Sequence, residues 1–326
     1  MRFEEFFQSY KYLINHVPCE TADKNKKYVI LSDLHLGDGG PKDDLRHNKY
    51  LIESLLYYYL QNDYSLILNG DIEDLNKFSY PDIRLAWDKL FGIFHDFHQE
   101  KRLIKIAGNH DLALLNEHDY PFPLHDGFVL NLAGKKIFML HGHQSSDFFL
   151  KYGYLSEYIV KYLLKPLSIK NSSVSESSKR SFSTEKLFYQ AARRLGILTI
   201  IGHTHRPLFE SLSKYDSIRW KLEHLVKKKK NTYLSRNLYS TNPFLVPCLF
   251  NSGCATGRHG ITALEIEPHT ISLIHWGQDP AIKSFIKSEA LTVTEIHDRI
   301  FRHTLKRDKL ARLFLLMELV NLAKVV

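Results

Sequence analysis

The sequence predicts an α/β fold in four layers, α/β/β/α, with two mixed sheets packed face to face and helices outside. In roughly the first third of the chain, short apolar runs alternate with helical patterns, which is typical of parallel strands covered by helices. After Asp111 the pattern changes to short strands separated by turn residues, and this change indicates a second sheet.

The first sheet is expected from elements that alternate between helix and strand. In chain order they are a helix at 1–16, a strand from near Tyr28, a helix at 43–60, a strand at 65–68 and a helix at 81–98. The second sheet begins with a hairpin, because residues 128–132 and 136–140 flank the turn sequence Ala133-Gly134. Three later strands, at 245–250, 261–266 and 270–274, are expected to extend that second sheet.

Two segments interrupt this scaffold and are interpreted as insertions into a main domain at 1–278. The first, at about 144–196, contains an aromatic-rich helix, a Ser-rich linker and a second helix, and we expect a helical cap. The second, at about 212–244, is polar and Lys-rich. Residues 279–326 are expected to form a C-terminal helical extension whose apolar stripe packs on the body or forms a homodimer contact; contact with a membrane surface is the alternative.

Composition limits the class of protein. With 326 residues, 44% of them hydrophobic, the chain suits one large folded domain with insertions. The three scattered cysteines give no disulfide framework and favour a reducing compartment, so we expect a cytoplasmic protein, with the inner membrane as a site of peripheral contact. We expect neither a signal peptide nor a spanning helix, because the N-terminus carries early acids and no run of about 18 apolar residues occurs. The net charge of +8 favours an anionic partner, and nucleic acid is one alternative.

Five polar clusters indicate the functional site, and several of them directly follow an apolar run. They are Asp33-Leu34-His35, Gly70-Asp71-Ile72-Glu73-Asp74, Gly108-Asn109-His110-Asp111, His141-Gly142-His143 and Gly202-His203-Thr204-His205. The carboxyl ends of strands are where sites assemble in α/β sheets. We therefore expect one pocket that holds two metal ions.

The residue types in these clusters suit divalent metals with mixed oxygen and nitrogen ligands. Carboxylates with imidazoles favour Mn²⁺, Fe or Zn²⁺, whereas a structural zinc site would use thiolates. Asp33 and His35 point to the same face of an extended chain, and the two oxygens of Asp71 allow it to bridge two ions. Each cluster alone could be a surface pair or a turn, but together they indicate a metal site.

The order D-x-H, G-D-x-x-D, G-N-H-D, H-G and G-H-T-H resembles the calcineurin-like metallophosphoesterases over about residues 28–276. This resemblance implies the metallo-dependent phosphatase fold and two divalent metal ions, with manganese expected and Fe or Zn as alternatives. It implies that one ion is held by Asp33, His35 and His205, and the other by Asn109, His141 and His203. Asp71 is implied as the bridging ligand.

The resemblance also implies the reaction. A metal-bridged hydroxide attacks phosphorus, His110 contacts the phosphate and protonates the leaving oxygen as general acid, and Asp74 orients His110. Two further residues are hypotheses from their position: Arg46 as a phosphate clamp, with an ordinary helix start as the alternative, and His143 as a neighbour that supports a ligand.

The substrate is less well defined by sequence. Leu75-Asn76 after Asp74, and Asp111 after His110, depart from the protein Ser/Thr phosphatases. The stretches Ser32–Gly37 and Gly202–Pro207 are similar to the bacterial UDP-2,3-diacylglucosamine pyrophosphohydrolases, although His143 replaces an aspartate of that group. We expect a phosphodiesterase or pyrophosphatase that acts on a phosphorylated small molecule, linked to a nucleotide or a lipid. A DNA or RNA nuclease of the same superfamily and a non-catalytic scaffolding protein are the alternatives.

Overall fold

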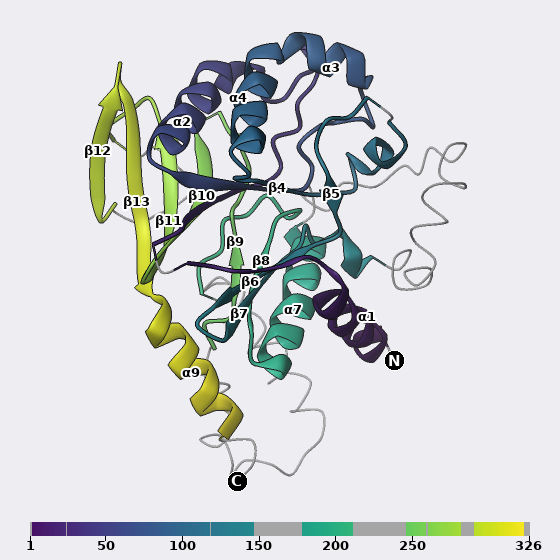
Figure 1. The fold of residues 1–326 in the computed structure, drawn as a ribbon, viewed down its shortest axis with the longest axis vertical. Coiled ribbons are helices and arrows are strands. Elements are labelled where there is room, and N and C mark those ends of the chain that lie inside the picture. The colour runs from purple at the N-terminus through teal and green to yellow at the C-terminus, as the bar shows by residue number, and fades with distance from the viewer. Residues whose placement is uncertain are drawn as a thin grey trace.

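A computed structural model describes residues 2–23, 25–117, 119–146, 178–210, 246–258, 260–281 and 290–322. Two sheets form the centre of the molecule and helices lie outside them, which confirms the predicted α/β architecture (Figure 1). The predicted helix at 148–164 and the predicted insertion at 212–244 lie outside the described residues.

The larger sheet has eight strands in the order β12-β13-β11-β10-β2-β3-β4-β5. Strands β2 to β5 run parallel, whereas β10, β11, β13 and β12 add antiparallel pairs at one side. Their bounds are β2 (Lys27–Leu31), β3 (Tyr64–Asn69), β4 (Leu103–Ile106), β5 (Leu124–His125), β10 (Ile261–Glu267), β11 (Thr270–Gly277), β12 (Thr292–His297) and β13 (Ile300–Lys309).

The smaller sheet has five strands in the order β1-β6-β7-β8-β9. Their bounds are β1 (Cys19–Thr21), β6 (Phe128–Leu132), β7 (Lys135–Met139), β8 (Leu198–Ile201) and β9 (Leu249–Asn251). The predicted hairpin is confirmed, since β6 and β7 pair antiparallel around Ala133 and Gly134. Both turn residues have positive φ angles, 50° and 82°, as the tight turn of a hairpin requires.

The helices lie on both outer faces. In chain order they are α1 (Arg2–His16), the 3-10 helix η1 (Arg46–Asn48), α2 (Lys49–Gln61), α3 (Tyr80–Ala86), α4 (Asp88–Gln99), η2 (Leu112–Asn116), η3 (His143–Ser145), α7 (Ser178–Leu195) and α9 (Leu310–Leu322). Helices α2, α3 and α4 cover the larger sheet, and α1 with α7 covers the smaller one (Figure 1).

The buried hydrophobic residues form two clusters, because successive side chains along a strand point to opposite faces of the sheet. In β2, Ile30 belongs to the core between the sheets, whereas Val29 and Leu31 pack with α2 and α4. On the other side, Tyr10 of α1 contacts Phe138 of β7 with ring centroids 5.2 Å apart. The strands are therefore apolar on both faces, as expected for buried strands covered by helices.

Several sequence-based boundaries and placements were wrong. The helix expected at 43–60 begins only at Lys49, after a loop and η1, and the helix expected at 81–98 is divided at Trp87. The strands expected at 261–266 and 270–274 join the larger sheet beside β2, not the second sheet. Only β9, of the three late strands, extends the second sheet.

The predicted C-terminal helical extension is also partly wrong. Residues 292–297 and 300–309 form β12 and β13, and only α9 is helical in this part of the described chain. β13 pairs with β11 from Phe301 to Lys309, so it belongs to the larger sheet. The apolar stripe on α9 does pack on the body, because Leu313 and Met317 are buried in the core.

The second helix of the expected cap is part of the scaffold. β7 and β8 pair in parallel, and α7 lies in the crossover between them. Phe188 and Ala191 of α7 are buried in the core, and Phe188 meets Phe6 of α1 at 5.0 Å between ring centroids. The part of the expected cap from 178 to 195 therefore covers the smaller sheet.

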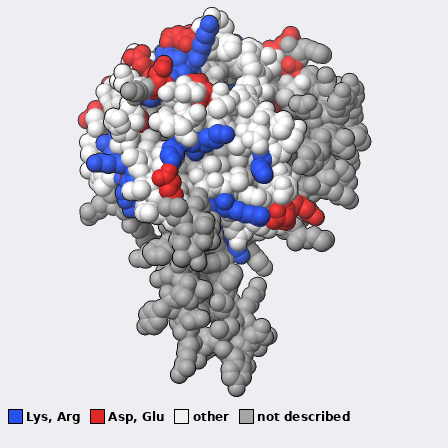
Figure 2. All heavy atoms as spheres, turned by 60° about the horizontal axis from the view of Figure 1, so that its bottom comes forward, with Lys and Arg blue, Asp and Glu red and all other residues white. Residues whose placement is uncertain are grey.

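Surface charge and helix length bear on the expected partners. On the face shown in Figure 2, basic and acidic side chains are interspersed over the described surface. The basic side chains of the described residues therefore form no single patch on that face. No helix within the described segments combines the length and the apolar composition that a bilayer crossing requires.

Candidate metal centre

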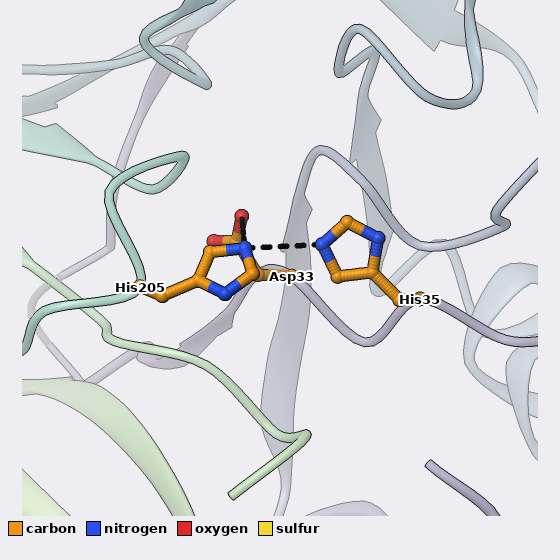
Figure 3. A group of neighbouring side chains, drawn as sticks. All are labelled: Asp33, His35 and His205. Atoms are coloured by element: carbon orange, nitrogen blue, oxygen red, sulfur yellow. Dashed lines mark hydrogen bonds and ion pairs between the residues drawn. The ribbon is translucent and has the colours of Figure 1, made fainter. Parts of the chain in front are cut away.

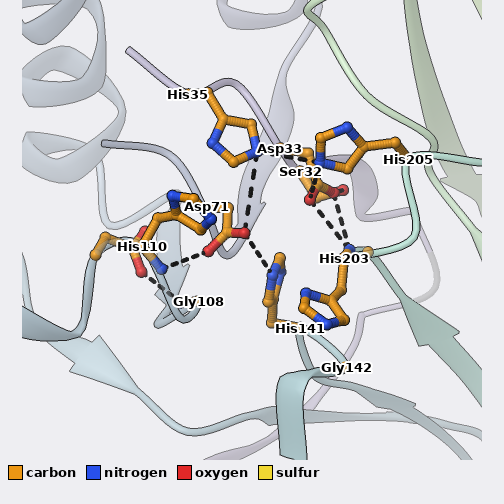
Figure 4. A network of polar contacts seen from close by, with 12 residues as sticks. Ser32, Asp33, His35, Asp71, Gly108, His110, His141, Gly142, His203 and His205 are labelled. Atoms are coloured by element: carbon orange, nitrogen blue, oxygen red, sulfur yellow. Dashed lines mark hydrogen bonds and ion pairs between the residues drawn. The ribbon is translucent and has the colours of Figure 1, made fainter. Parts of the chain in front are cut away.

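The polar clusters follow the carboxyl ends of β2, β3, β4, β7 and β8 and meet in one region between the two sheets (Figure 4). Backbone hydrogen bonds hold the loops together: Asp33 N–H donates to Gly70 O at 3.0 Å, and Gly202 N–H donates to His141 O at 2.8 Å. Parallel strands of both sheets thus bring residues that are far apart in sequence to one place.

Five site residues adopt left-handed backbone conformations, which residues other than glycine rarely use. Their φ angles are 54° at Asp33, 50° at His35, 53° at Asp71, 65° at His203 and 55° at His205. Such conformations cost free energy and cluster at functional sites. Close packing adds to the constraint, because a Cβ on Gly108 would lie 2.2 Å from the backbone nitrogen of Asp71.

The first group of ligand-type side chains consists of Asp33, His35 and His205 (Figure 3). Their ligand atoms all lie within 4.8 Å of one another. His205 Nε2 is 3.2 Å from Asp33 Oδ1 and 3.1 Å from His35 Nε2. The Asp33 carboxylate also accepts hydrogen bonds from the backbone N–H of His203, at 3.0 and 3.1 Å, and from Ser32 Oγ at 2.5 Å.

The second group consists of Asp71, His141 and His203, again within 4.8 Å. His141 Nε2 lies 3.0 Å from Asp71 Oδ2, and its Nδ1–H donates to the carbonyl oxygen of Asn69 at 2.9 Å. Since a carbonyl only accepts, this bond fixes the proton on Nδ1 and directs Nε2 into the site, an arrangement typical of metal-ligating histidines.

Asp71 lies between the two groups. It belongs to the second group and to a third, in which its ligand atoms approach His35 and His110. Its Oδ2 lies 4.0 Å from His35 Nε2, and its Oδ1 accepts the backbone N–H of His110 at 2.8 Å. Next to His110, the buried Oδ1 of Asn109 has no hydrogen-bond partner among the described residues. A buried carbonyl oxygen without a donor is costly in a folded protein, and a cation would satisfy it.

His110 is paired with Asp74. His110 Nδ1 lies 2.8 Å from Asp74 Oδ1, and Lys77 Nζ lies 3.0 Å from Asp74 Oδ2. Burial opposes the charged form of His110, but the hydrogen bond to Asp74 and the negative charges of Asp71 and Asp74 together outweigh it and raise the pKa of His110. The raised pKa favours the protonated form of His110, which is the form that a general acid requires.

The histidines of the two groups differ in charge state in the metal-free protein. Burial lowers the pKa of His35 to about 4 and that of His203 to about 3, so both are neutral and ready to ligate. Burial opposes protonation of His141 as well, but Asp71 outweighs it and raises the pKa of His141 to about 9. Asp33 likewise outweighs burial and raises the pKa of His205.

His143 and Arg46, the two residues that were hypotheses from their position, differ in burial. His143 is 5% exposed, begins η3, and its ring centroid is 5.6 Å from that of His141. Burial, followed by the nearby His141 and His203, lowers the pKa of His143 well below the usual value, which keeps it neutral. Arg46 is exposed on η1. Their functional roles stay predictions.

Sequence reasoning missed the buried charges that support these loops. Asp111 Oδ2 accepts the backbone N–H of Ile72 at 2.9 Å, and its other oxygen accepts that of Gly108. Glu73 and Lys105 form an ion pair, with 0% and 1% of their side chains exposed. Lys105 gave a signal that could have been used, because it interrupts the otherwise apolar strand Leu103–Ile106. Glu185 of α7, also fully buried, gave no local signal.

Comparison with known proteins assigns a class to this site. Residues 26–231 match the family model of the calcineurin-like phosphoesterases. Together with the two mixed sheets and the Asp and His groups that could bind metal, this match defines a hydrolase of the metal-dependent phosphoesterase class. The match spans well over half of the sequence, and the chain belongs to the calcineurin-like phosphoesterase family.

The solved structures that are similar to this chain include the following three. Vacuolar protein sorting 29 from Cryptosporidium parvum is 13% identical, with a TM-score of 0.40, over 88% of this chain and 100% of that one. The E. coli phosphoesterase Yfce is 14% identical, with a TM-score of 0.35, over 76% and 91%. A dimetal phosphatase from Danio rerio is 11% identical, with a TM-score of 0.34, over 78% and 97%. No curated protein matches the chain.

Proposed function

We propose that this protein hydrolyses phosphoester bonds at a dinuclear metal centre. The proposed first site is formed by Asp33, His35 and His205, and the proposed second site by Asn109, His141 and His203, with Asp71 shared between them. The observation that best supports two sites is that Asp71 and His35 each belong to two overlapping ligand groups. The unsatisfied Asn109 Oδ1 fits the same assignment.

The ligand types of the two proposed sites fit a divalent transition metal. Four imidazoles, two carboxylates and one amide oxygen suit Mn²⁺, with Fe or Zn²⁺ as alternatives. Two divalent cations, when bound, supply charge that neutralises phosphoryl oxygens and lowers the pKa of a coordinated water.

The protein's own residues supply orientation and a proton. His141 is oriented by the Asn69 carbonyl, and the Asp33 carboxylate is fixed by the His203 N–H and Ser32. In the proposed mechanism, Nε2 of His110 protonates the departing oxygen while its Nδ1 is held by Asp74. Burial opposes ionisation of Asp74, but His110 and then Lys77, which contacts the second oxygen, outweigh it and lower the pKa of Asp74.

For the substrate we propose a phosphodiester or pyrophosphate linked to a nucleotide or a lipid. Support comes from Leu75-Asn76 and Asp111, which depart from the protein phosphatase motifs, and from the likeness of Ser32–Gly37 to the UDP-2,3-diacylglucosamine hydrolases. Arg46 is the proposed contact to a distal phosphate, and His143 the proposed neighbour that fixes His141.

The test is hydrolysis by Mn²⁺-loaded protein of bis-p-nitrophenyl phosphate, p-nitrophenyl phosphate, UDP-sugars, nucleotides and DNA. We expect faster turnover of the diester than of the monoester, and cleavage of a UDP-linked pyrophosphate. Preferential cleavage of DNA would instead assign the nuclease alternative. No turnover of any substrate would contradict the proposed activity and favour a scaffolding role.

A further inference from the structure

The loop from Gly202 to Arg206 carries two of the proposed ligands in a conformation that it would not adopt alone. His203 and His205 both have positive φ angles, 65° and 55°, and the residue between them donates its backbone N–H to Gly202 O at 2.7 Å. Two left-handed residues in three positions are unfavourable, so contacts from the surrounding structure must stabilise the loop.

Thr204, the residue between the two histidines, is 0% exposed, and its hydroxyl is fully engaged. Asn251 Nδ2 donates to Thr204 Oγ1 at 2.9 Å and also to Gly202 O at 2.9 Å. The Thr204 hydroxyl in turn lies 2.9 Å from Glu185 Oε1. An amide nitrogen only donates and a carboxylate oxygen accepts, so the hydroxyl proton points to Glu185.

Glu185 holds the loop on both sides of His205. Its second oxygen, Oε2, accepts a hydrogen bond from Arg206 Nη2 at 2.9 Å. The Glu185 side chain is 0% exposed, and a buried carboxylate is stable only when it is paired and hydrogen-bonded. Glu185 lies on α7, in the segment that precedes Gly202, and none of the ligand motifs includes it.

We propose that Glu185 is a positioning residue for both metal sites, which it supports by fixing Thr204 and Arg206 on either side of His205. This inference rests on the proposed dinuclear centre. Because the same loop carries His203 of the second group and His205 of the first, loss of the contact weakens both sites together. Ligand-orienting contacts of this kind alter metal affinity by about 10- to 100-fold.

The experiment measures Mn²⁺ dissociation constants by chelator competition, with thermal midpoints of the metal-free proteins measured in parallel. Thr204→Val keeps the side-chain shape and removes the hydroxyl, and we expect it to weaken both sites by about 10- to 100-fold. Thr204→Ser keeps the hydroxyl, and its Mn²⁺ dissociation constants should be close to those of the wild-type protein. Glu185→Gln, which removes the charge opposite Arg206, should weaken both sites even if Thr204→Val proves too unstable to study.

The matched control is Glu265→Gln. Glu265 is also 0% exposed and paired with an arginine, Arg302, but its hydrogen-bond partners among the described residues lie in β13 and α2 rather than in the metal centre. It should lower the thermal midpoint and leave both dissociation constants within twofold. A loss of thermal stability in Thr204→Val and Glu185→Gln with unchanged dissociation constants would overturn the inference. A wild-type protein that binds no Mn²⁺ would overturn the proposed function and this inference with it.

Discussion

Asp71 lies between the two groups of ligand-type side chains, and its two oxygens face different partners. Oδ2 lies near His141 and His35, and Oδ1 accepts the His110 backbone N–H. Burial opposes ionisation of Asp71, but His141, His110 and His35 outweigh it and lower the pKa of Asp71 well below the usual value. Asp71 is therefore an anion at neutral pH, as its proposed role as a shared ligand requires.

His110 and Asp71 should differ in what their loss removes. His110→Ala should lower kcat by about 100- to 10,000-fold, because a general acid contributes about that much, while the protein keeps two bound metal ions. Asp71→Ala should lose metal as well as activity. Metal analysis of both variants, with the exposed His95→Ala as control, checks this. Equal metal loss in both variants would refute the role assigned to His110.

Metal affinity should depend on pH with a defined sign. The pKa of His141 is raised to about 9 by Asp71, against burial, and that of His205 is raised by Asp33, so both carry protons at pH 7 in the metal-free protein. Ligation requires neutral imidazoles, so binding must release these protons, and affinity rises as the pH rises toward 9. Calorimetry of Mn²⁺ binding in buffers of different ionisation enthalpy should show proton release at pH 7. Binding without proton release and independent of pH from 6 to 9 would contradict these charge states.

The sequence was sufficient to predict which ligand-type residues meet, because each motif follows a strand and parallel strands end at one edge. The structure brings together Asp33, His35, Asp71, His141, His203 and His205, with Asn109, His110 and Asp74 beside them. Their roles remain predictions. The contacts of Glu185 and Asp111 could not be predicted in the same way, since they are set by packing between distant segments rather than by local spacing.

At the scale of elements, strand β4 is joined to the loop after β3 by buried charge. Lys105 of β4 pairs with Glu73, whose other oxygen accepts the Tyr120 hydroxyl at 2.9 Å. Glu73 lies between Asp71 and Asp74 and forms a bridge with Leu36 of the first loop. The pair therefore supports two of the loops that carry site residues.

Removing one member of the Lys105–Glu73 pair should lower the free energy of unfolding more than removing both members. Lys105→Met leaves a buried, uncompensated carboxylate and should lower the free energy of unfolding by about 3–5 kcal/mol. The double variant Lys105→Met/Glu73→Gln should recover most of that loss. Lys26→Met, which breaks a half-exposed pair with Glu20, should cost about 0–1 kcal/mol in the same denaturant titrations. A Lys105→Met cost as small as that of the control would contradict the account.

Element type was easier to predict than element placement. Local apolar periodicity identified β2, β3, β6 and β7, and the left-handed turn at Ala133 and Gly134 was readable from sequence. Periodicity cannot say which sheet a strand joins, because β10 could pair with either sheet on its apolar pattern. The prediction of helix where β12 and β13 lie was wrong for a different reason. Short residue patterns can fit both the helical period and the strand period.

At the scale of the whole molecule, the C-terminal strands β12 and β13 are part of the larger sheet rather than a separate extension. Ile300, Leu305 and Leu313 are at most 2% exposed. Arg302 of β13 pairs with the buried Glu265 of β10, and Tyr59 of α2 donates to the same carboxylate at 2.8 Å. These contacts join β13 to both the larger sheet and its helices.

A chain ending at residue 278 should therefore fold poorly. Each large apolar side chain removed from the core contributes about 1.5–3 kcal/mol, and several are lost together. We expect an insoluble product, or a thermal midpoint far below that of the full chain. If the shortened chain instead kept the full-length midpoint and metal content, the boundary at 278 would mark an independent domain, and our view of β13 would be wrong.

The central claim is that one pocket between the two sheets holds two metal ions that act together on a phosphoester. The most direct test is the initial rate of bis-p-nitrophenyl phosphate hydrolysis by metal-free protein titrated with Mn²⁺. We predict no turnover without metal and a rate that rises to a maximum at two equivalents of Mn²⁺ per chain. A rate that saturates at one equivalent, or that is already present in metal-free protein, would contradict the claim.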